Sequence, residues 1–301
     1  MPHLPLPLVR AVLRPLYALT LNARLPYPVQ RRLLEAAAPI QTLPSGTVVR
    51  QTSLAGRPTE RVTVGASERP TAVLYLHGGA YTCASPATHR SLVAHLAAAS
   101  GSVVYTLDYR LAPEHPYPAA VDDAVAAYLE LLSEHDLTPE NVSIAGDSAG
   151  GGLTVATANR LIGEQGITPA ALGLLSPWTD PGSRTAPFER DVVINTGWAY
   201  SSAEAYLGGG DPTDPGYAPM HSDLTGLPPT LIQVGTTELL YPQILEFAGK
   251  LRAAGVDLTL VEQPELWHVA GLQASLVKEA ADAVVEFGEF LRSHMAARSQ
   301  A

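Results

Sequence analysis

The spacing of apolar residues along the chain changes near position 45. Before that point apolar side chains recur every three or four positions, in two runs: Leu8, Val9, Val12, Leu13 and Leu16, then Val29, Leu33 and Leu34. This period predicts two short amphipathic helices joined through residues 22–27. Such helices need an apolar surface to lie on, which is either the protein's own core or a membrane face. Because the chain as a whole is acidic, with a net charge of −10, we expect them to cover the core.

From position 46 the pattern changes to that of strands. Residues 47–51 and 60–64 predict a two-stranded start, with the turn at 56–58. Short apolar runs then alternate with longer helical stretches. The predicted strands are 72–76, 102–107, 141–145, 171–175, 230–234 and 256–261, and the predicted helices are 85–99, 119–133, 153–161, 241–254 and 274–294. This alternation predicts an α/β protein with a mostly parallel central sheet covered by helices on both faces.

Residues 181–227 interrupt the alternation. The segment carries several prolines, the run Gly208-Gly209-Gly210 and the aromatic residues Trp198, Tyr200 and Tyr206. A long irregular insertion in an α/β domain is usually functional, so we expect a lid here.

Composition and charge exclude several classes of function. The apolar fraction of 46% and the charged fraction of 16% are those of an ordinary globular protein. The net charge of −10 argues against nucleic acid or an anionic membrane surface as a partner. No apolar stretch is long enough to span a bilayer, so we expect no stable membrane insertion. Prolines interrupt the N-terminal residues, and we expect no signal peptide.

The single cysteine, Cys83, leaves no internal disulfide and no cysteine metal cluster. It is compatible with a reducing compartment, and we expect a cytoplasmic location. Histidines and carboxylates lack the spacing of metal ligands, and the glycines match neither a P-loop nor a dinucleotide fingerprint. We therefore expect no metal and no cofactor.

The strongest local signal is Gly146-Asp147-Ser148-Ala149-Gly150, between a predicted strand and a predicted helix. A strand that turns sharply into a helix leaves no room for a Cβ two residues either side of the turning residue, which explains the glycines. The turn would hold Ser148 Oγ at a helix N-terminus, where the dipole favours developing negative charge. The alternative is a glycine-rich turn with an incidental serine.

A nucleophilic serine needs a base, and the base needs an orienting acid. In one known order of these groups the acid and then the histidine follow the serine. Of the histidines after Ser148, His294 falls in the polar end of the closing helix and His221 within the insertion. His268 follows the last predicted strand, at the sheet edge that also presents Ser148, and is the predicted base.

The acid is expected in the loop after strand 230–234, where Glu238 is the only carboxylate. The alternative for Glu238 is a carboxylate that pairs with a helix dipole. Asp223 and Asp257 are weaker candidates, since the first comes too early and the second lies inside a predicted strand.

An oxyanion needs backbone N–H donors that are already in place. Ala149, directly after the serine, is one predicted donor, and Gly78 and Gly79, in the loop after strand 72–76, are the others. His77 is a second possible base, but it precedes the serine and is expected to hold this loop by a local hydrogen bond.

With these residues assembled, the chain resembles the hormone-sensitive-lipase-like (bacterial family IV) esterases of the α/β-hydrolase fold. The resemblance extends from residue 73 to the C-terminus. It is carried by His77-Gly78-Gly79-Ala80, the segment 108–120, Gly146-Asp147-Ser148-Ala149-Gly150-Gly151 and Ser176-Pro177-Trp178-Thr179-Asp180. The overall length of the chain and the segment Leu227-Pro228-Pro229, which precedes predicted strand 230–234, suggest the monoterpene lactone hydrolase and small-ester branch of this family.

The resemblance implies hydrolysis of short- to medium-chain acyl esters or lactones through an acyl-enzyme, with Ser148 as nucleophile, Glu238 as acid and His268 as base. It implies a helical cap made of residues 1–45 and 181–227 on a core of residues 46–180 and 228–301. Relatives often form homodimers through the last strand and helix. The cap aromatics are candidates for substrate contact: Tyr17, Tyr27, Trp198, Tyr200 and Tyr206.

Three positions depart from the family pattern. Ala80 replaces the third glycine of the loop, Glu238 stands where the family mostly has aspartate, and Val269-Ala270 follows His268 where Gly-Phe is usual. Two other functions remain open. One is a non-catalytic module that binds a small molecule on the same fold, as in the related plant gibberellin receptors, which lack the histidine. The other is amidase or acyltransferase chemistry on the same three residues.

Overall fold

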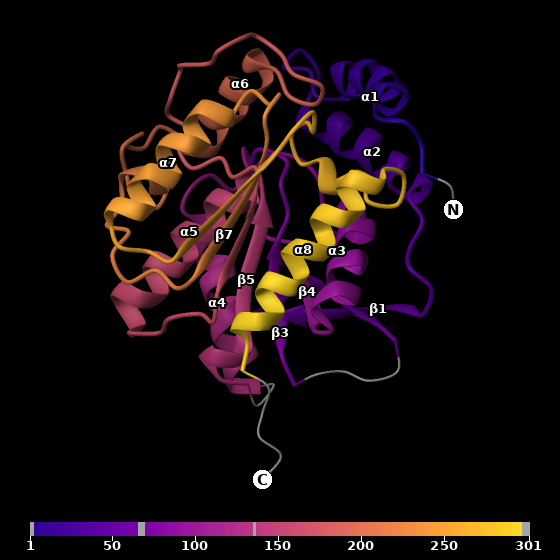
Figure 1. Cartoon of the computed structure of the whole chain (residues 1–301). Coiled ribbons are helices and arrows are strands. Elements are labelled where there is room, and N and C mark those ends of the chain that lie inside the picture. The colour runs from indigo at the N-terminus through magenta and orange to yellow at the C-terminus, as the bar shows by residue number, and fades with distance from the viewer. Residues whose placement is uncertain (1–2, 66–69, 135–136, 297–301) are drawn as a thin grey trace.

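The computed structural model describes residues 3–65, 70–134 and 137–296. A single sheet runs through the centre of the molecule, with helices on both of its faces (Figure 1). Its strands are β1 (Thr47–Leu54), β2 (Arg57–Val64), β3 (Ala72–Leu76), β4 (Val103–Leu107), β5 (Val142–Asp147), β6 (Leu172–Leu175), β7 (Thr230–Gly235) and β8 (Leu258–Gln263). The α-helices are α1 (Leu6–Thr20), α2 (Tyr27–Ala37), α3 (Pro86–Ser100), α4 (Ala119–Glu134), α5 (Ala149–Arg160), α6 (Thr196–Leu207), α7 (Tyr241–Ala253) and α8 (Lys278–His294).

Short helical turns connect these elements. They are η1 (Ala38–Ile40), η2 (Pro139–Asn141), η3 (Leu161–Gln165), η4 (Pro219–His221) and η5 (Ala270–Gln273). Within the described residues, no helix has the length and apolar character needed to cross a bilayer.

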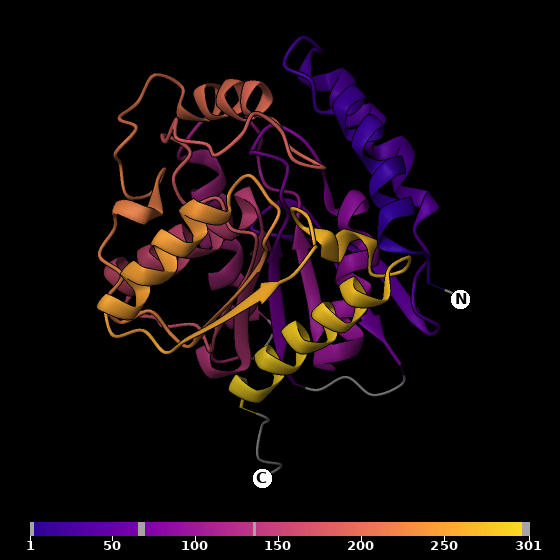
Figure 2. The same ribbon diagram turned by 45° about the horizontal axis from the view of Figure 1, so that its top comes forward.

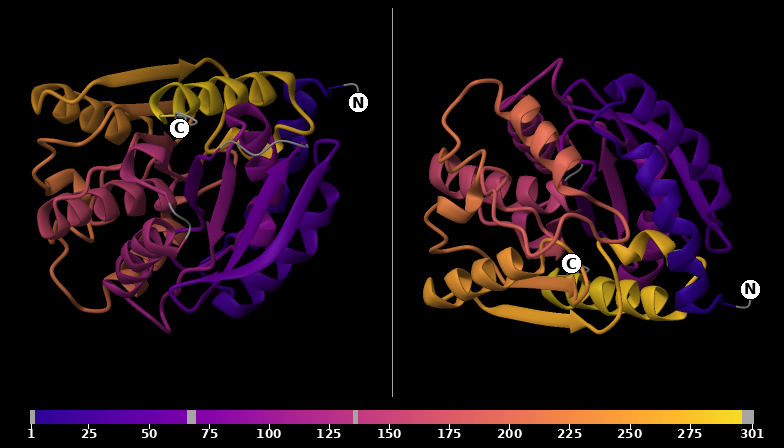
Figure 3. Two further views of the ribbon diagram at one scale, coloured as in Figure 1. Left: turned by 90° about the horizontal axis from the view of Figure 1, so that it is seen from below. Right: turned by 90° about the horizontal axis from the view of Figure 1, so that it is seen from above.

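The strands lie in the order β1-β2-β4-β3-β5-β6-β7-β8, and all neighbours from β4 to β8 are parallel. β3, β4, β5 and β6 are buried along their whole length because helices cover both faces. α3 and α8 pack on one face, and α4, α5 and α7 on the other (Figure 3). The predicted α/β class, with a mostly parallel sheet between two layers of helices, is confirmed.

Several predicted boundaries are wrong; β8, for example, begins at Leu258 and not at 256, so Asp257 lies outside the strand in which it was expected. The hairpin turn consists of Ala55 and Gly56, since β2 already begins at Arg57. Both turn residues have positive φ, 51° and 72°, which is the backbone that a tight two-residue turn requires. The closing helix begins at Lys278 and not at 274, because residues 274–276 form a turn after η5.

The two predicted N-terminal helices are present as α1 and α2. With α6 they lie at the end of the molecule to which the carboxyl ends of the parallel strands point (Figures 1 and 2). α1 buries Val9 and Leu13 against the protein, as expected. Leu8 and Val12, from the same predicted apolar run, are 52% and 59% exposed, so that run covers the core with only part of its side chains.

Buried hydrogen bonds join α2 to α6. Gln30 accepts a hydrogen bond from Trp198 Nε1 at 2.8 Å and donates to the backbone oxygens of Asn22 and Leu25. Gln30 is fully buried, and each of these bonds satisfies a polar group that burial would otherwise leave without a partner. The N-terminal segment and the 181–227 insertion therefore contact one another, although they are far apart in the sequence.

The contact between α3 and α8 allows a test of the packing. A Cβ on Gly288 of α8 would lie 2.4 Å from Ala99 Cβ and 3.0 Å from Ser100 N. We expect Gly288→Ala to lower the free energy of unfolding by about 1–3 kcal/mol, since the two helices must separate. Gly249→Ala on α7 is the control, because its Cβ would meet no atom within 4 Å. This control should raise the free energy of unfolding by about 1 kcal/mol. Urea unfolding measures both, and equal effects would contradict the packing described.

Candidate active site

Ser148 occupies the turn between β5 and α5, as the glycine spacing predicts. It is the one residue between strand and helix, with φ and ψ of 50° and −119°. A Cβ on Gly146 would lie 2.3 Å from the carbonyl oxygen of Gly150, and a Cβ on Gly150 would lie 1.9 Å from that of Leu76. The glycines are therefore required by the close packing of the turn, which holds Ser148 in a strained conformation.

Three side chains from distant segments form one hydrogen-bonded chain. Ser148 Oγ lies 2.9 Å from His268 Nε2, and His268 Nδ1 lies 2.6 Å from Glu238 Oε2. Because an ionised carboxylate only accepts hydrogen bonds, His268 Nδ1–H donates to Glu238. Nε2 is then the acceptor for the Ser148 hydroxyl, and all three residues are buried.

The other histidines and carboxylates weighed from the sequence lie elsewhere. His221 is 3.4 Å from Asp180, and His294 is at the end of α8. Asp223 accepts a hydrogen bond within its own turn, and the backbone oxygen of Asp257 accepts one from the start of β7. The structure thus brings Ser148, His268 and Glu238 together and leaves the alternatives outside this group.

Burial alone lowers the pKa of His268, but its surroundings reverse the effect. The hydrogen bond to Glu238 and the negative charge of that carboxylate outweigh burial, with further contributions from Asp191 and Asp147. The pKa of His268 therefore lies above its ordinary value of 6.5. The site favours the imidazolium, which is the form that arises when the ring takes a proton from a serine.

Ser176 links Glu238 to the loop that carries His268, a role that the sequence does not predict. Its hydroxyl donates to Glu238 Oε1 at 2.9 Å and accepts a hydrogen bond from Val269 N at 3.1 Å. Glu238 Oε1 also accepts from Gly235 N at 2.6 Å. The longer glutamate side chain is thus held at both oxygens. The only signal in the sequence was the motif Ser176-Pro177-Trp178-Thr179-Asp180.

Asp191, in the 181–227 insertion, was also missed. One carboxylate oxygen accepts hydrogen bonds from the backbone N–H groups of Val193 and Ile194, both at 2.7 Å. The other accepts from Leu239 N, directly after Glu238, at 2.9 Å. A buried carboxylate of the insertion therefore holds the loop that carries the acid. Nothing in the sequence pattern connects these distant positions.

Gly78 does not fit the donor role predicted for it. Its N–H already donates to Asp147 Oδ1 at 2.9 Å. Tyr75 O–H donates to the same oxygen, and His89 Nε2 lies 3.2 Å from the other. Burial raises the pKa of Asp147, but the charge and hydrogen bond of His89 and the Tyr75 hydroxyl outweigh it and hold the pKa below its ordinary value. The ionised Asp147 is thus a stable acceptor that occupies the Gly78 N–H.

Gly79, by contrast, lines the same cavity as Ser148. Among the residues that the structure describes, the N–H groups of Gly79, Ala80 and Ala149 have no acceptor. A Cβ on Gly79 would lie 2.2 Å from the Cys83 carbonyl oxygen, so no other residue fits this loop conformation. Three unsatisfied donors around a buried serine can bind a developing negative charge.

His77 supports this loop, as predicted. Its Nδ1–H donates to its neighbour's carbonyl, Gly78 O, at 2.8 Å, and its ring stacks on Tyr109 with centroids 4.4 Å apart. Burial, together with the nearby His89, lowers the pKa of His77 to about 3. A ring with so low a pKa stays neutral, and it lies away from the Ser148 hydrogen-bonded chain.

A mostly apolar cavity of ≈ 240 Å³ opens over Ser148 and His268. Tyr17 of α1 and Trp198 of α6 line it, so two of the five predicted aromatics are near the substrate position. The other three serve packing or hydrogen bonding: Tyr27 contacts Ser201, Tyr200 donates to the Arg184 carbonyl, and Tyr206 stacks on Tyr81. Among the described residues, no group of three or more His, Cys, Asp or Glu is placed to hold a metal ion.

The fold and the serine site define an α/β hydrolase, and comparison with known families agrees. A family model described as alpha/beta hydrolase fold matches residues 73–272. An acetyl-hydrolase of Streptomyces hygroscopicus is 43% identical over 225 residues, which are 73% of this chain and 75% of that protein.

Comparison with solved structures identifies the family of α/β hydrolases to which the chain is similar. The crystal structure of an esterase from the bacterial hormone-sensitive lipase family has a TM-score of 0.90 and 38% identity, covering 98% of this chain and all of that one. EstE5 soaked with p-nitrophenyl butyrate has a TM-score of 0.88 and 36% identity, covering 97% of this chain and 99% of that one. The chain belongs to the bacterial hormone-sensitive lipase family of esterases, and it is a carboxylesterase.

The electrostatics of the site predict the titration of His268. We expect its imidazole to titrate with a midpoint above 6.5. Glu238→Gln should move the midpoint downward, since it removes the charge that outweighs burial. NMR of imidazole nitrogens measures this, and a His268→Gln spectrum identifies the resonance. A midpoint that does not move in Glu238→Gln would mean that the carboxylate does not control the base.

The same raised pKa has a defined effect on stability. Because the pKa of His268 is higher in the folded than in the unfolded chain, its protonation stabilises the folded state. This stabilisation is fully present at pH values below the pKa of the unfolded chain, and it is lost as the pH rises through the pKa of the folded chain.

Proposed function

We propose that Ser148, His268 and Glu238 hydrolyse short- to medium-chain carboxylic esters through an acyl-enzyme. The observation that carries this proposal is the hydrogen-bonded chain of the three residues, closed at 2.9 Å and 2.6 Å. Ser148 Oγ attacks the ester carbonyl carbon while His268 Nε2 takes the hydroxyl proton. The ester C–O bond then breaks, and the proton passes to the departing alcohol oxygen.

The second half of the cycle uses the same groups. A water molecule gives a proton to His268 Nε2 and attacks the acyl carbon. The bond to Ser148 Oγ breaks, the serine recovers its proton from the ring, and the carboxylic acid leaves. Glu238 keeps the Nδ1–H tautomer throughout and stabilises the imidazolium that forms in each half.

We assign the oxyanion donors to Gly79, Ala80 and Ala149. This retains two of the three residues predicted from the sequence and replaces Gly78, whose N–H is bonded to Asp147. Gly78 then has an indirect role, because its hydrogen bond to Asp147 fixes the start of the loop that carries Gly79. Ala80, at the third position of the family's loop motif, contributes through its backbone, so the lost glycine leaves the donor in place.

We infer that the acyl group is short. The cavity of ≈ 240 Å³ is below the roughly 300–1,000 Å³ typical of sites for drug-sized ligands. Its lining surface is mostly apolar, which suits an acyl chain. The names of the relatives agree, since one is an acetyl-hydrolase and another was soaked with p-nitrophenyl butyrate. Lactones, which are cyclic esters, stay a prediction for the same site.

We propose that residues 1–45 and 181–227 act together as the cap. Tyr17 and Trp198 line the cavity from the two segments, and the Trp198–Gln30 bond joins them. Asp191 links the cap to the acid loop, so cap position and acid position are coupled. A homodimer formed through β8 and α8 and a cytoplasmic location stay predictions.

Removal of the nucleophile tests the mechanism. Ser148→Ala should lower kcat for a p-nitrophenyl ester by roughly 10⁴-fold or more and abolish labelling by a fluorophosphonate. Ser293→Ala, on the surface of α8, is the control and should keep both. Parent protein that binds esters but neither turns them over nor is labelled would instead be a binding module. Faster turnover of amides than of esters would favour the amidase reading.

The cavity volume predicts chain-length selectivity. With p-nitrophenyl esters from C2 to C12, kcat/KM should be highest for short acyl groups and fall for the longest, because a long chain does not fit beneath the cap. A few lactones belong in the same panel. A preference for C12 would contradict a short-ester site.

A further inference from the structure

α1 presents an apolar face to solvent on the side away from the core. Leu8, Val12 and Leu19 are 52%, 59% and 69% exposed. Their spacing places them on one side of the helix, next to the buried row of Val9 and Leu13. Exposed apolar side chains that cluster on one surface usually mark an interaction site.

This face is continuous with the mouth of the catalytic cavity. Val12 and Leu16 line the cavity and are also 59% and 38% exposed. Ile40, which follows α2, lines the cavity as well and is 72% exposed. An apolar molecule can therefore pass from the outer surface to Ser148 without crossing a polar rim at these residues.

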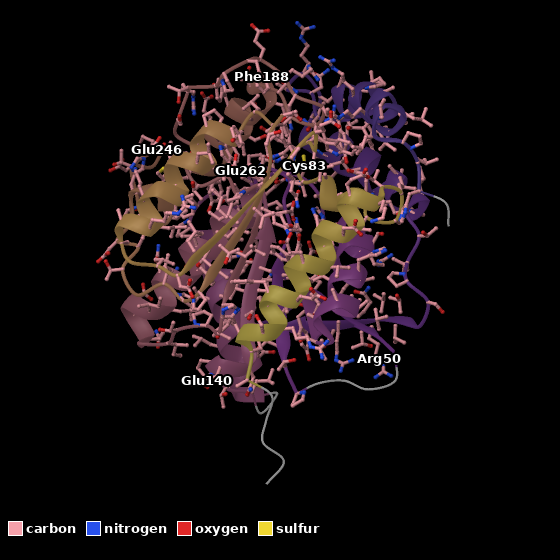
Figure 4. All side chains as sticks on the ribbon, viewed as in Figure 1. Arg50, Cys83, Glu140, Phe188, Glu246 and Glu262 are labelled. Carbon is pink, nitrogen blue, oxygen red and sulfur yellow. The ribbon has the colours of Figure 1, made fainter. Side chains whose placement is uncertain are left out.

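A basic cleft of ≈ 610 Å³ lies beside the same helix, between α1 and the segment 188–192. Arg10, Arg14 and Arg190 line it, with Phe188 at its edge, 42% exposed. Figure 4 shows Phe188 at the end of the molecule where α1 and α6 lie.

The arginines of the cleft have no acidic partner among the described residues. Nε and Nη2 of Arg10 are buried and without a hydrogen-bond partner. The one carboxylate that lines the cleft, Asp191, uses both oxygens for backbone N–H groups. The exposed neighbour Glu189 forms no ion pair in the described structure. The Arg10 guanidinium lies over the Trp267 ring, 5.8 Å from its centroid, and its two buried nitrogens without an acceptor point to a ligand with acceptor oxygens.

The local charge differs in sign from that of the whole chain. Residues 1–45 hold five arginines and one glutamate, a net charge of +4, whereas the whole chain carries −10. Charges are screened over about 8 Å at physiological salt, so a surface that approaches α1 experiences the basic segment first. The net charge of the whole chain therefore does not describe the charge of this face.

We propose that α1 and the arginine cleft dock on an anionic lipid surface. A lipid phosphate would occupy the cleft of Arg10, Arg14 and Arg190, while Leu8 and Leu19 enter the acyl layer beside it. The helical period places Arg10 and Arg14 on the opposite flank of α1 from Leu8 and Leu19, so a lipid surface that approaches the helix from outside can meet both flanks. Docking is peripheral, it directs the cavity mouth toward the lipid, and it does not depend on the proposed hydrolysis.

Vesicle flotation of the full chain tests this proposal. The parent should bind vesicles of equal parts phosphatidylcholine and phosphatidylglycerol and not vesicles of phosphatidylcholine alone. Arg14→Gln with Arg190→Gln should weaken binding by roughly 30-fold. Leu8→Ser with Leu19→Ser should weaken it as well. None of these residues lines the catalytic cavity, so turnover of a water-soluble ester should persist and report that the variants fold.

Matched controls separate this surface from charge and hydrophobicity in general. Arg50→Gln with Arg252→Gln removes two exposed arginines elsewhere, Arg50 lying at the opposite end of the molecule from Phe188 (Figure 4). Val285→Ser removes a 47% exposed apolar side chain on α8. Neither control should alter flotation.

Three outcomes would overturn the proposal. The first is equal flotation of the parent and the Arg14/Arg190 variant. The second is complete release of the parent by inorganic phosphate under conditions in which an equal ionic strength of chloride releases none, which would assign the cleft to free phosphate. The third is a dimer in light scattering that Leu8→Ser with Leu19→Ser converts to a monomer, without any vesicle binding by the parent, which would make this face a contact between copies.

Discussion

The site depends on one steric constraint, the contact between the Ser148 turn and the end of β3. Gly150 lies so close to Leu76 that a Cβ would be 1.9 Å from its carbonyl oxygen. The loop that starts after Leu76 carries Gly79, so Ser148 and Gly79 are positioned by the same contact. Parallel pairing of β3 with β5 brings the two strand ends to one edge, and the missing Cβ atoms let them meet.

Around this contact the arrangement follows from satisfying buried polar groups. Asp147 takes the Gly78 N–H and leaves that of Gly79 without an acceptor. Ser176 and Asp191 hold the acid loop from two sides, one from the end of β6 and one from the insertion. A buried carboxylate without hydrogen bonds is costly, so the bonds from Ser176 and Gly235 N stabilise the buried Glu238, while Asp191 fixes the backbone of the adjacent Leu239. A shift of the insertion would therefore act on Glu238 through the backbone of its neighbour Leu239, without contact to Ser148.

The sequence was sufficient for features whose signal is local or follows chain order. The alternation of strands and helices gave the parallel sheet, and the elbow glycines gave the turn at Ser148. Glu238 and His268 were predicted because each lies in the loop after one of the last two strands, and the structure brings these two side chains together with Ser148. The role of Gly78 was wrong because its acceptor, Asp147, is 69 residues away. The roles of Ser176 and Asp191 could not be predicted for the same reason, since a hydrogen bond from a short polar side chain to distant backbone produces no pattern in the sequence.

The N-terminal helices show why a whole-chain property cannot decide a local one. The helical spacing of their apolar residues predicts that they lie on an apolar surface, and the negative net charge of the whole chain favours the protein core over a membrane as that surface. α1 is apolar on two adjoining sides, and a helix in contact with a globular body can bury only one of them. The other apolar side carries the exposed Leu8 and Leu19, and a separate flank of the same helix carries Arg10 and Arg14, which have no acidic partner in the described structure. Core and external surface are therefore not exclusive alternatives for α1, because one apolar side of the helix is buried and the other is exposed.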